Sequence, residues 1–393
     1  MSAILSVIKK AWRETDNTLL LLCMAASCFG CLMVTSATEY SRPADSLISR
    51  DVRAMLIAVV VGIVGALIIS FIDYEVIIRL WPVIAGVCIL LLLLTLVFGV
   101  GPNERSDVRS WLQLPGGYYF QPSELVKIGF IVTFGVHLDI VKDKIRNFKT
   151  VLLLCLHGAI PTVLVMLAGD MGSSLIFLII FAVMIFMGGI APKHIALGFA
   201  AVAAAVPIAW RFVLGDIQKN RILALLYPED YPDIIYQQDR GITAIGSGGW
   251  TGAGLFQGQY TQNHLIPEGE NDMIFAVIGE ELGFLGCLFA LFILAMIILK
   301  IVSTGNQSRD NATSLMCYGL AAMLTGQIAV NVGMCLMLLP VVGITLPFYS
   351  AGGSSTLCLY VGIGLALSIY RHNREGAAVN FRLSRIRTPF SED

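Results

Sequence analysis

Charged side chains are scarce in this sequence of 393 residues. They make up 13% of the chain, whereas 56% of the residues are hydrophobic and the mean hydropathy is +0.79. A water-soluble domain needs more polar surface, so the composition predicts a protein that crosses a membrane several times. The formal net charge is only −1, and nothing in it indicates a nucleic-acid partner.

Long polar segments that contain cysteine are also missing. All nine cysteines fall inside apolar runs, so neither a disulfide framework nor a zinc site is indicated. Residues 1–16 are too weakly apolar for a cleavable signal peptide. We expect them to be a cytoplasmic segment, either an amphipathic helix on the membrane surface or an unstructured tail.

Runs of about 20 apolar residues predict transmembrane helices. We expect ten of them, and therefore an all-α polytopic membrane protein that forms one domain over residues 1–393. The predicted spans are 17–37, 54–73, 77–100, 123–141, 149–168, 171–189, 192–214, 273–301, 312–341 and 350–370.

Lysine and arginine are distributed unevenly among the connecting segments, most clearly in "VKDKIRNFK" at 141–149. Such residues favour the cytoplasmic side, so the bias predicts that both termini are cytoplasmic. Residues 215–272 then form a large extracytoplasmic loop between spans 7 and 8, and residues 371–393 form a cytoplasmic tail.

Acidic residues occur where charge is costly. Asp272 falls at the outer end of the eighth predicted span, and Glu280 and Glu281 lie roughly 12 Å deeper. Asp272 suits either a helix cap or a functional carboxylate. Ionisable groups within spans usually face a partner or water, so Glu280 and Glu281 suit either a structural ion pair or a functional role.

A second group of charged residues lies near the outer ends of other spans. Glu124 and Lys127 are three residues apart on one helix face, which suits a salt bridge, although the lysine could also reach a lipid headgroup. Asp170 is placed to cap a helix. Together with Arg109 and Arg221, these residues would suit a diphosphate, with or without a metal ion.

The glycine-rich run 244–258, "AIGSGGWTGAGLFQG", superficially resembles a nucleotide-binding loop. The pattern is weak, because no predicted strand precedes it and no predicted helix opens from it. We interpret it as backbone that fits closely against a substrate or the membrane.

Four segments, in one order along nearly the whole chain, carry a family resemblance. They are "RSWLQLPGGYYFQPSELVK", "YQQDRGITAIGSGGWTGAGLFQG", "ENDMIFAVIGEELGFLG" and "QIAVNVGMCLMLLPVVGITLPFYSAGGSS". The chain resembles the SEDS family (shape, elongation, division and sporulation), which includes RodA and FtsW. The resemblance implies a peptidoglycan glycosyltransferase that polymerises lipid II on the outer face of the bacterial cytoplasmic membrane, during elongation or division. The short termini favour the elongation type, RodA.

The resemblance also implies roles for particular residues. Asp272 matches the family's essential aspartate and would be the general base, which takes the proton from a sugar hydroxyl that attacks the anomeric carbon of the growing glycan. Undecaprenyl diphosphate would leave with inversion. The expected substrate-binding residues are Arg109, Glu124, Lys127, Arg221, Ser350, Gly352, Gly353 and Ser354, and structural roles are expected for Glu280, Glu281 and Asp170.

Some features depart from the family pattern. "GDMG" replaces the usual "PDLG" around Asp170, Arg240 and Gly241 replace a Gln-Ser pair, and Ala351 replaces a tyrosine.

A divalent cation, Mg²⁺ or Mn²⁺, would assist at the diphosphate, although the sequence shows no set of metal ligands.

The outer loops contain no "SxxK" motif, so we do not expect the chain to crosslink peptides itself. The resemblance implies a class B penicillin-binding protein as the transpeptidase partner, beside other proteins of the elongation or division complex. Two other classes of function stay open at this point. One is a lipid II flippase, and the other is a non-catalytic scaffold for a penicillin-binding protein.

Overall fold

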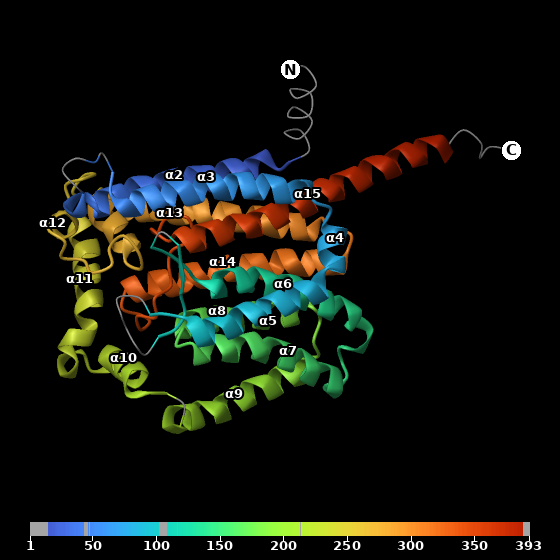
Figure 1. The fold of residues 1–393 in the computed structure, drawn as a ribbon, viewed down its shortest axis with the longest axis horizontal. Helices are drawn as coiled ribbons and strands as arrows, with labels where there is room; N and C mark the ends of the chain where they lie inside the picture. The colour runs from blue at the N-terminus through green and yellow to red at the C-terminus, as the bar shows by residue number, and fades with distance from the viewer. Residues whose placement is uncertain are drawn as a thin grey trace, which may run out of the picture.

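The computed structural model describes residues 15–42, 46, 48–101, 108–115, 117–212 and 214–387. Almost all of the predicted N-terminal segment 1–16, and residues 388–393 of the predicted tail, therefore lie outside the described residues. Figure 1 shows long helices lying side by side, with α10, α11 and α12 gathered at one end of the bundle. We call this end the loop end.

The long helices are α2 (Asn17–Ala37), α3 (Arg50–Phe71), α5 (Trp81–Phe98), α6 (Pro122–Ile140), α7 (Phe148–Leu167), α8 (Met171–Met187), α9 (Pro192–Phe212), α13 (Ile274–Asn306), α14 (Asn311–Cys335) and α15 (Gly353–Arg387). Shorter helices are α4 (Tyr74–Arg79), α10 (Asp216–Leu226), α11 (Pro232–Gly248) and α12 (Gln259–Gln262), with 3₁₀ turns at Glu39–Ser41, Lys142–Lys144 and Pro228–Asp230.

Each predicted span coincides with one of the long helices, which confirms an all-α polytopic membrane protein. Eight of the described helices are long and apolar enough to cross a membrane. The other two are α6, which carries Glu124, Lys127 and Asp139, and α8, which is 17 residues long. The number of ten spans, and their sidedness, therefore stay predictions.

Helix ends follow local chemistry. The side chains of Asp16, Ser49, Asn147 and Asp170 accept hydrogen bonds from backbone amides at the starts of α2, α3, α7 and α8. These contacts satisfy amide groups that have no partner within the helix.

The ninth predicted span ended at residue 341, but α14 ends at Cys335. Pro340 cannot supply an amide hydrogen and restricts the residue before it, and Met337 has a φ of 56°. The chain stays irregular until α15 begins at Gly353. We call this stretch the 336–352 segment.

The predicted extracytoplasmic loop 215–272 contains α10, α11 and α12. Helix α11 runs into the glycine-rich stretch, and the chain beyond it packs on α13: the amides of Ala253 and Gly254 donate to the carbonyls of Glu280 and Glu281 at 2.9 and 3.0 Å. A Cβ on Gly252 would lie 2.1 Å from the Glu281 carbonyl oxygen, so only glycine fits there. Close backbone approach explains the glycine here.

A small hairpin, which the sequence did not predict, follows α5. Strand β1 (Leu112–Leu114) pairs antiparallel with β2 (Tyr118–Phe120). The Ser354 hydroxyl donates to the Tyr119 carbonyl at 2.9 Å, which attaches the hairpin to the first turn of α15. This hydrogen bond therefore connects the hairpin to the start of α15.

Candidate functional site

Asp272 lies at the loop end, immediately before α13. The cap position of α13 falls on Met273, whose side chain makes no capping hydrogen bond. The carboxylate of Asp272 is therefore not placed as the helix cap that its spacing also suggested. A Cβ on Gly343, in the 336–352 segment, would lie 3.5 Å from Asp272 Oδ2.

The electrostatic surroundings of Asp272 disfavour its charged form. Burial raises the pKa of this carboxyl from 3.8 to about 7; the negative charges of Glu268, Glu270 and Asp170 act in the same direction, and Arg221 opposes them. An acid with a pKa near the working pH is half deprotonated and can still accept a proton with useful driving force. Asp272 is thus suited to general-base chemistry near neutral pH.

Arg221 lies on α10 and contacts the same irregular segment as Asp272. Its Nη1 donates to the Val341 carbonyl at 2.9 Å, two residues before Gly343. The effect of Arg221 on the pKa of Asp272 shows that the two side chains are within electrostatic range. The structure thus brings a guanidinium and a carboxylate to one region, and the role of Arg221 in substrate binding stays a prediction.

Ser350 and Ala351 hold the backbone that leads to Asp272. The Ser350 hydroxyl donates to the Asn271 carbonyl at 2.7 Å, and the Ala351 amide donates to the Glu270 carbonyl at 2.8 Å. Because the second contact is made by backbone, alanine in place of the family's tyrosine retains it. Ser350 Oγ also accepts a hydrogen bond from the amide of Leu346 at 2.8 Å, and its role in substrate binding stays a prediction.

Glu124 and Lys127 form an ion pair inside the bundle. The Lys127 Nζ lies 2.8 Å from Glu124 Oε1, and the two side chains are only 0% and 7% exposed. The structure thus contains the salt bridge that their spacing suggested. In this arrangement the ammonium group does not reach the surface, so a contact with a lipid headgroup or diphosphate stays a prediction.

Asp170 joins two helices at the loop end. Its Oδ1 accepts from the Ser173 amide at 2.9 Å and caps α8, while Oδ2 accepts from Gln121 Nε2 at 2.7 Å and Ser123 Oγ at 3.1 Å. The last two residues lie at the start of α6, so Asp170 ties α6 to α8. This placement agrees with the structural role expected of Asp170.

Glu280 binds the loop chain rather than a cation. Its carboxylate accepts from the amides of Tyr260 and Thr261 at 2.6 and 2.9 Å, and from the Thr261 hydroxyl at 2.7 Å. Glu280 is 1% exposed. Among the described residues no lysine or arginine pairs with it; of the two alternatives for Glu280, the structural one takes the form of three hydrogen bonds to α12 and not of an ion pair.

Glu281 connects α13 to α2 and α12. Its Oε1 accepts from the Ser36 hydroxyl at 2.7 Å and from Gln262 Nε2 at 3.0 Å. Gln262 also donates to Ser36 Oγ at 3.0 Å, which closes a three-residue network. Ser36 and Gln262 were not predicted from the sequence. Ser36 lies 245 positions before Glu281, and Gln262 is separated from Glu281 by the irregular chain between α12 and α13.

The remaining predicted residues lie around this end. Arg109 is exposed, and its amide donates to the Ala168 carbonyl at 2.8 Å, beside the junction of α7 and α8. Gly352, Gly353 and Ser354 form the partly exposed entry to α15. Their roles in substrate binding stay predictions.

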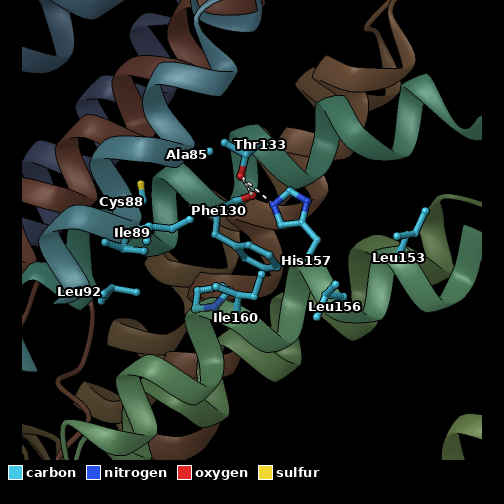
Figure 2. Close-up of a pocket in the computed structure, with 12 residues that line it drawn as sticks. Ala85, Cys88, Ile89, Leu92, Phe130, Thr133, Leu153, Leu156, His157 and Ile160 are labelled. Atoms are coloured by element: carbon cyan, nitrogen blue, oxygen red, sulfur yellow. Dashed lines mark hydrogen bonds between the residues drawn. The ribbon is translucent and has the colours of Figure 1, made fainter.

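An apolar groove lies between α5, α6 and α7, shown in Figure 2. It has a volume of about 240 Å³. Its wall contains one polar site, where His157 Nε2 and Thr133 Oγ1 lie 3.2 Å apart, and where His157 Nδ1 shares a 2.9 Å hydrogen bond with His137. A smaller cavity shares Leu92 with the groove and reaches Asp170.

Among the residues that the structure describes, side chains alone form no metal site. Within the described ranges, no three histidine, cysteine, aspartate or glutamate side chains come together around a position that a metal ion could occupy. The described residues do not by themselves fit a divalent cation, and no chemical step below depends on one.

Comparison with known proteins identifies the family. The family model described as "Cell cycle protein", which covers FtsW, RodA and SpoVE, matches residues 17–375. This chain belongs to that family. The SEDS resemblance carried by the four sequence segments is therefore confirmed.

Two curated relatives are similar over most of their length. Peptidoglycan glycosyltransferase MrdB of Escherichia coli K12 is 32% identical over 363 residues, which cover 91% of this chain and 94% of that protein. The probable peptidoglycan glycosyltransferase FtsW of Geobacter sulfurreducens is 33% identical over 369 residues, with 90% and 94% covered. These nearly equal identities do not separate the elongation type from the division type.

Solved structures share the fold. A chain from a peptidoglycan synthase complex, whose structure is described as "Structural coordination of polymerization and crosslinking", gives a TM-score of 0.77 at 27% identity, with 91% of this chain and 98% of that chain covered. The rod shape-determining protein RodA of Thermus thermophilus gives a TM-score of 0.66 at 25% identity, with 91% and 97% covered.

Proposed function

We propose that this SEDS protein is a peptidoglycan glycosyltransferase that polymerises lipid II at the outer face of the bacterial cytoplasmic membrane, with both termini in the cytoplasm. The observation that carries the proposal is Asp272, a partly buried carboxyl with a pKa of about 7 at the loop end, within range of Arg221. Its relatives bear the name peptidoglycan glycosyltransferase. Growth of the wall during elongation or division is the corresponding cellular role.

Asp272 would act on the acceptor sugar. Its carboxylate takes the proton from the 4-hydroxyl of the GlcNAc of one lipid II molecule as that oxygen attacks the anomeric carbon of MurNAc in the growing glycan. The bond between this carbon and the diphosphate oxygen breaks, and undecaprenyl diphosphate leaves with the electron pair. Attack opposite the leaving group inverts the anomeric centre from α to β.

Positive charge near Asp272 suits the leaving group. Arg221 would offset the charge that develops on the diphosphate, because a fixed cation in a partly dehydrated site stabilises a developing anion. Arg109 is exposed at the same end and is a second candidate. Lys127 can take part only if its ion pair with Glu124 opens.

The apolar groove between α5, α6 and α7 supports the proposal that the substrate carries a hydrocarbon chain. Its apolar wall contains Ile89 and Leu156, which are 40% and 56% exposed on helices long enough to span the membrane. A separate small cavity shares Leu92 with this groove and is lined by Asp170, and Asp170 acts on the pKa of Asp272. An isoprenoid chain lying in the groove would place its diphosphate near the loop end.

A partner and a cation complete the proposal. One structurally similar chain comes from a peptidoglycan synthase complex that coordinates polymerisation and crosslinking, and we propose that a class B penicillin-binding protein, with other elongation or division proteins, assembles with this chain. We propose a divalent cation, Mg²⁺ or Mn²⁺, only as a companion of the substrate. Mg²⁺ is often held by one or two carboxylates together with substrate phosphates.

Polymerisation of labelled lipid II by the purified chain with its penicillin-binding partner tests the proposal. Asp272→Asn keeps the shape of the side chain and removes the base, so the rate should fall by about 10²- to 10⁴-fold. Asp233→Asn, an exposed position in α11, is the matched control and should polymerise normally. Equal polymer from Asp272→Asn and the control would leave Asp272 without a catalytic role, as a scaffold predicts.

A further inference from the structure

Asn331 is a buried amide close to the C-terminal end of α14. It lies on α14 and has 0% exposure. Its Nδ2 donates to two backbone carbonyls, that of Asp272 at 2.8 Å and that of Ile344 at 2.7 Å. One side chain thus connects the residue before α13 to the 336–352 segment.

This contact is the last of three on consecutive carbonyls. The Ala351 amide holds the carbonyl of Glu270, the Ser350 hydroxyl holds that of Asn271, and Asn331 holds that of Asp272. Residues 270–272 form a turn rather than a helix, so these carbonyls depend on donors from elsewhere in the chain. We call the three contacts the carbonyl clamp.

The carbonyl clamp fixes both sides of the Asp272 carboxyl. On one side it holds the backbone from which the side chain projects, and on the other it holds Ile344, next to Gly343, which faces Asp272 Oδ2. The side chain of Cys335, one turn after Asn331, lies 3.7 Å from the same Asp272 carbonyl. Loss of the amide would therefore release the turn and the facing segment together.

We propose that Asn331 is a positioning residue for the reaction: by bridging the carbonyls of Asp272 and Ile344, it sets the direction and the distance of the base relative to the attacking hydroxyl. The proposal rests on the proposed function, because it takes Asp272 as the base. Misplacement of a reacting group by about 1 Å can cost about 100-fold in rate. Substrate affinity depends on other contacts and should change little.

Two variants remove the donor without emptying the site. Asn331→Asp keeps the shape, and Asn331→Leu keeps most of the volume. In lipid II polymerisation with the penicillin-binding partner, we expect kcat to fall by about 100-fold while KM stays within about threefold. In Asn331→Leu a looser turn also admits water, so the acid limb of the pH profile, which the pKa of Asp272 near 7 sets, should move to lower pH; the acidic group added in Asn331→Asp opposes this shift.

Gln327 supplies the matched control. It lies one turn before Asn331 on α14, is 2% exposed, and its Oε1 has no hydrogen-bond partner among the described residues. Gln327→Leu should retain kcat within about threefold and leave the pH profile in place. If Asn331→Leu folds normally and matches Gln327→Leu in kcat and in pH profile, the positioning role is refuted.

Hydrogen exchange tests the carbonyl clamp without any activity. The Ala351 amide should exchange at least tenfold faster in the Asn331 variants than in wild type or Gln327→Leu, because its acceptor is no longer held. Unchanged exchange refutes the proposal, even if wild type proves inactive and the proposed function fails. If neither Asn331 variant folds, Ser350→Ala removes the adjacent contact and is judged by the same kcat, KM and exchange criteria.

Discussion

Gly343 faces Asp272 so closely that a Cβ on the glycine would lie 3.5 Å from the carboxylate oxygen Oδ2. The glycine is exposed and has a φ of 73°, in the left-handed region. The approach to the base is therefore bordered by backbone that carries no side chain. A substitution at Gly343 therefore tests whether the acceptor sugar approaches Asp272 from this side.

Gly343→Ala should lower both activity and stability. The left-handed backbone costs alanine about 1–2 kcal/mol, and the added methyl group would be in van der Waals contact with Asp272 Oδ2. Polymerisation rate and thermal unfolding measure the two effects. Gly86→Ala in α5, where an added Cβ meets nothing within 4 Å, should keep activity; equal activity of both variants would show that substrate does not pass Gly343.

The rate of polymerisation should rise with pH through about 7. Asp272 can accept a proton only when it is deprotonated, and its pKa is raised to about 7. Glu268 is the largest charge that raises this pKa, so Glu268→Gln should move the midpoint to lower pH. The pH dependence of kcat measures this shift, and Glu229→Gln, an exposed acid in the same loop, should leave the midpoint unchanged.

Lys127→Met should destabilise the fold by about 3–5 kcal/mol, because it leaves the buried Glu124 carboxylate without its partner. Adding Glu124→Gln should recover much of this loss. Thermal unfolding of the single and double variants measures it, and Arg79→Met, which breaks a pair that is 79% and 59% exposed, should cost less than about 1 kcal/mol. A stable but inactive double variant would point to a role in substrate binding; a stable and active one would assign the pair to structure alone.

Thr261→Val should loosen the loop end. It removes the hydroxyl that donates to the buried Glu280 carboxylate at 2.7 Å, and hydrogen bonds to charged groups contribute about 1.5–3 kcal/mol. We expect a lower unfolding temperature and faster proteolysis within residues 249–263. Thr243→Val, whose hydroxyl donates to a backbone carbonyl on an exposed helix face, is the control; identical behaviour of the two variants would contradict this prediction.

Removal of divalent cations should reduce polymerisation if a cation accompanies the diphosphate. We expect EDTA to lower kcat and added Mg²⁺ or Mn²⁺ to restore it, with no change in the unfolding temperature of the protein alone. The last point follows because the described residues form no three-ligand metal site. Full activity in EDTA would remove the cation from the proposal.

Local pattern predicted much of the fold. The first predicted span, 17–37, coincides with α2, and the fourth lies within a residue of α6, because long apolar runs determine these helices. The same rule overextended the ninth span, since residues 336–341 are apolar yet irregular. Hydropathy does not register the backbone restrictions at Pro340 and Met337.

The site was less readable than the helices. Asp272 could be singled out as a charge at a span boundary, but the residues that hold it could not. Asn331 was not predicted because it lies in an apolar run, although side-chain amides in membrane helices often make specific contacts. Its partner lies 59 positions earlier, and hydrogen bonds over such separations are fixed by helix packing.

The carbonyl clamp has a consequence for the order in which the chain is made. Asn331 lies 59 residues after Asp272, and Ser350 lies 79 residues after Asn271. The ribosome therefore synthesises Asp272 well before the two side chains that hold this backbone. Domains fold as their parts emerge, and contacts between distant parts form last. A chain that stalls after α13 would therefore contain Asp272 but lack the donors that hold the backbone at Asn271 and Asp272.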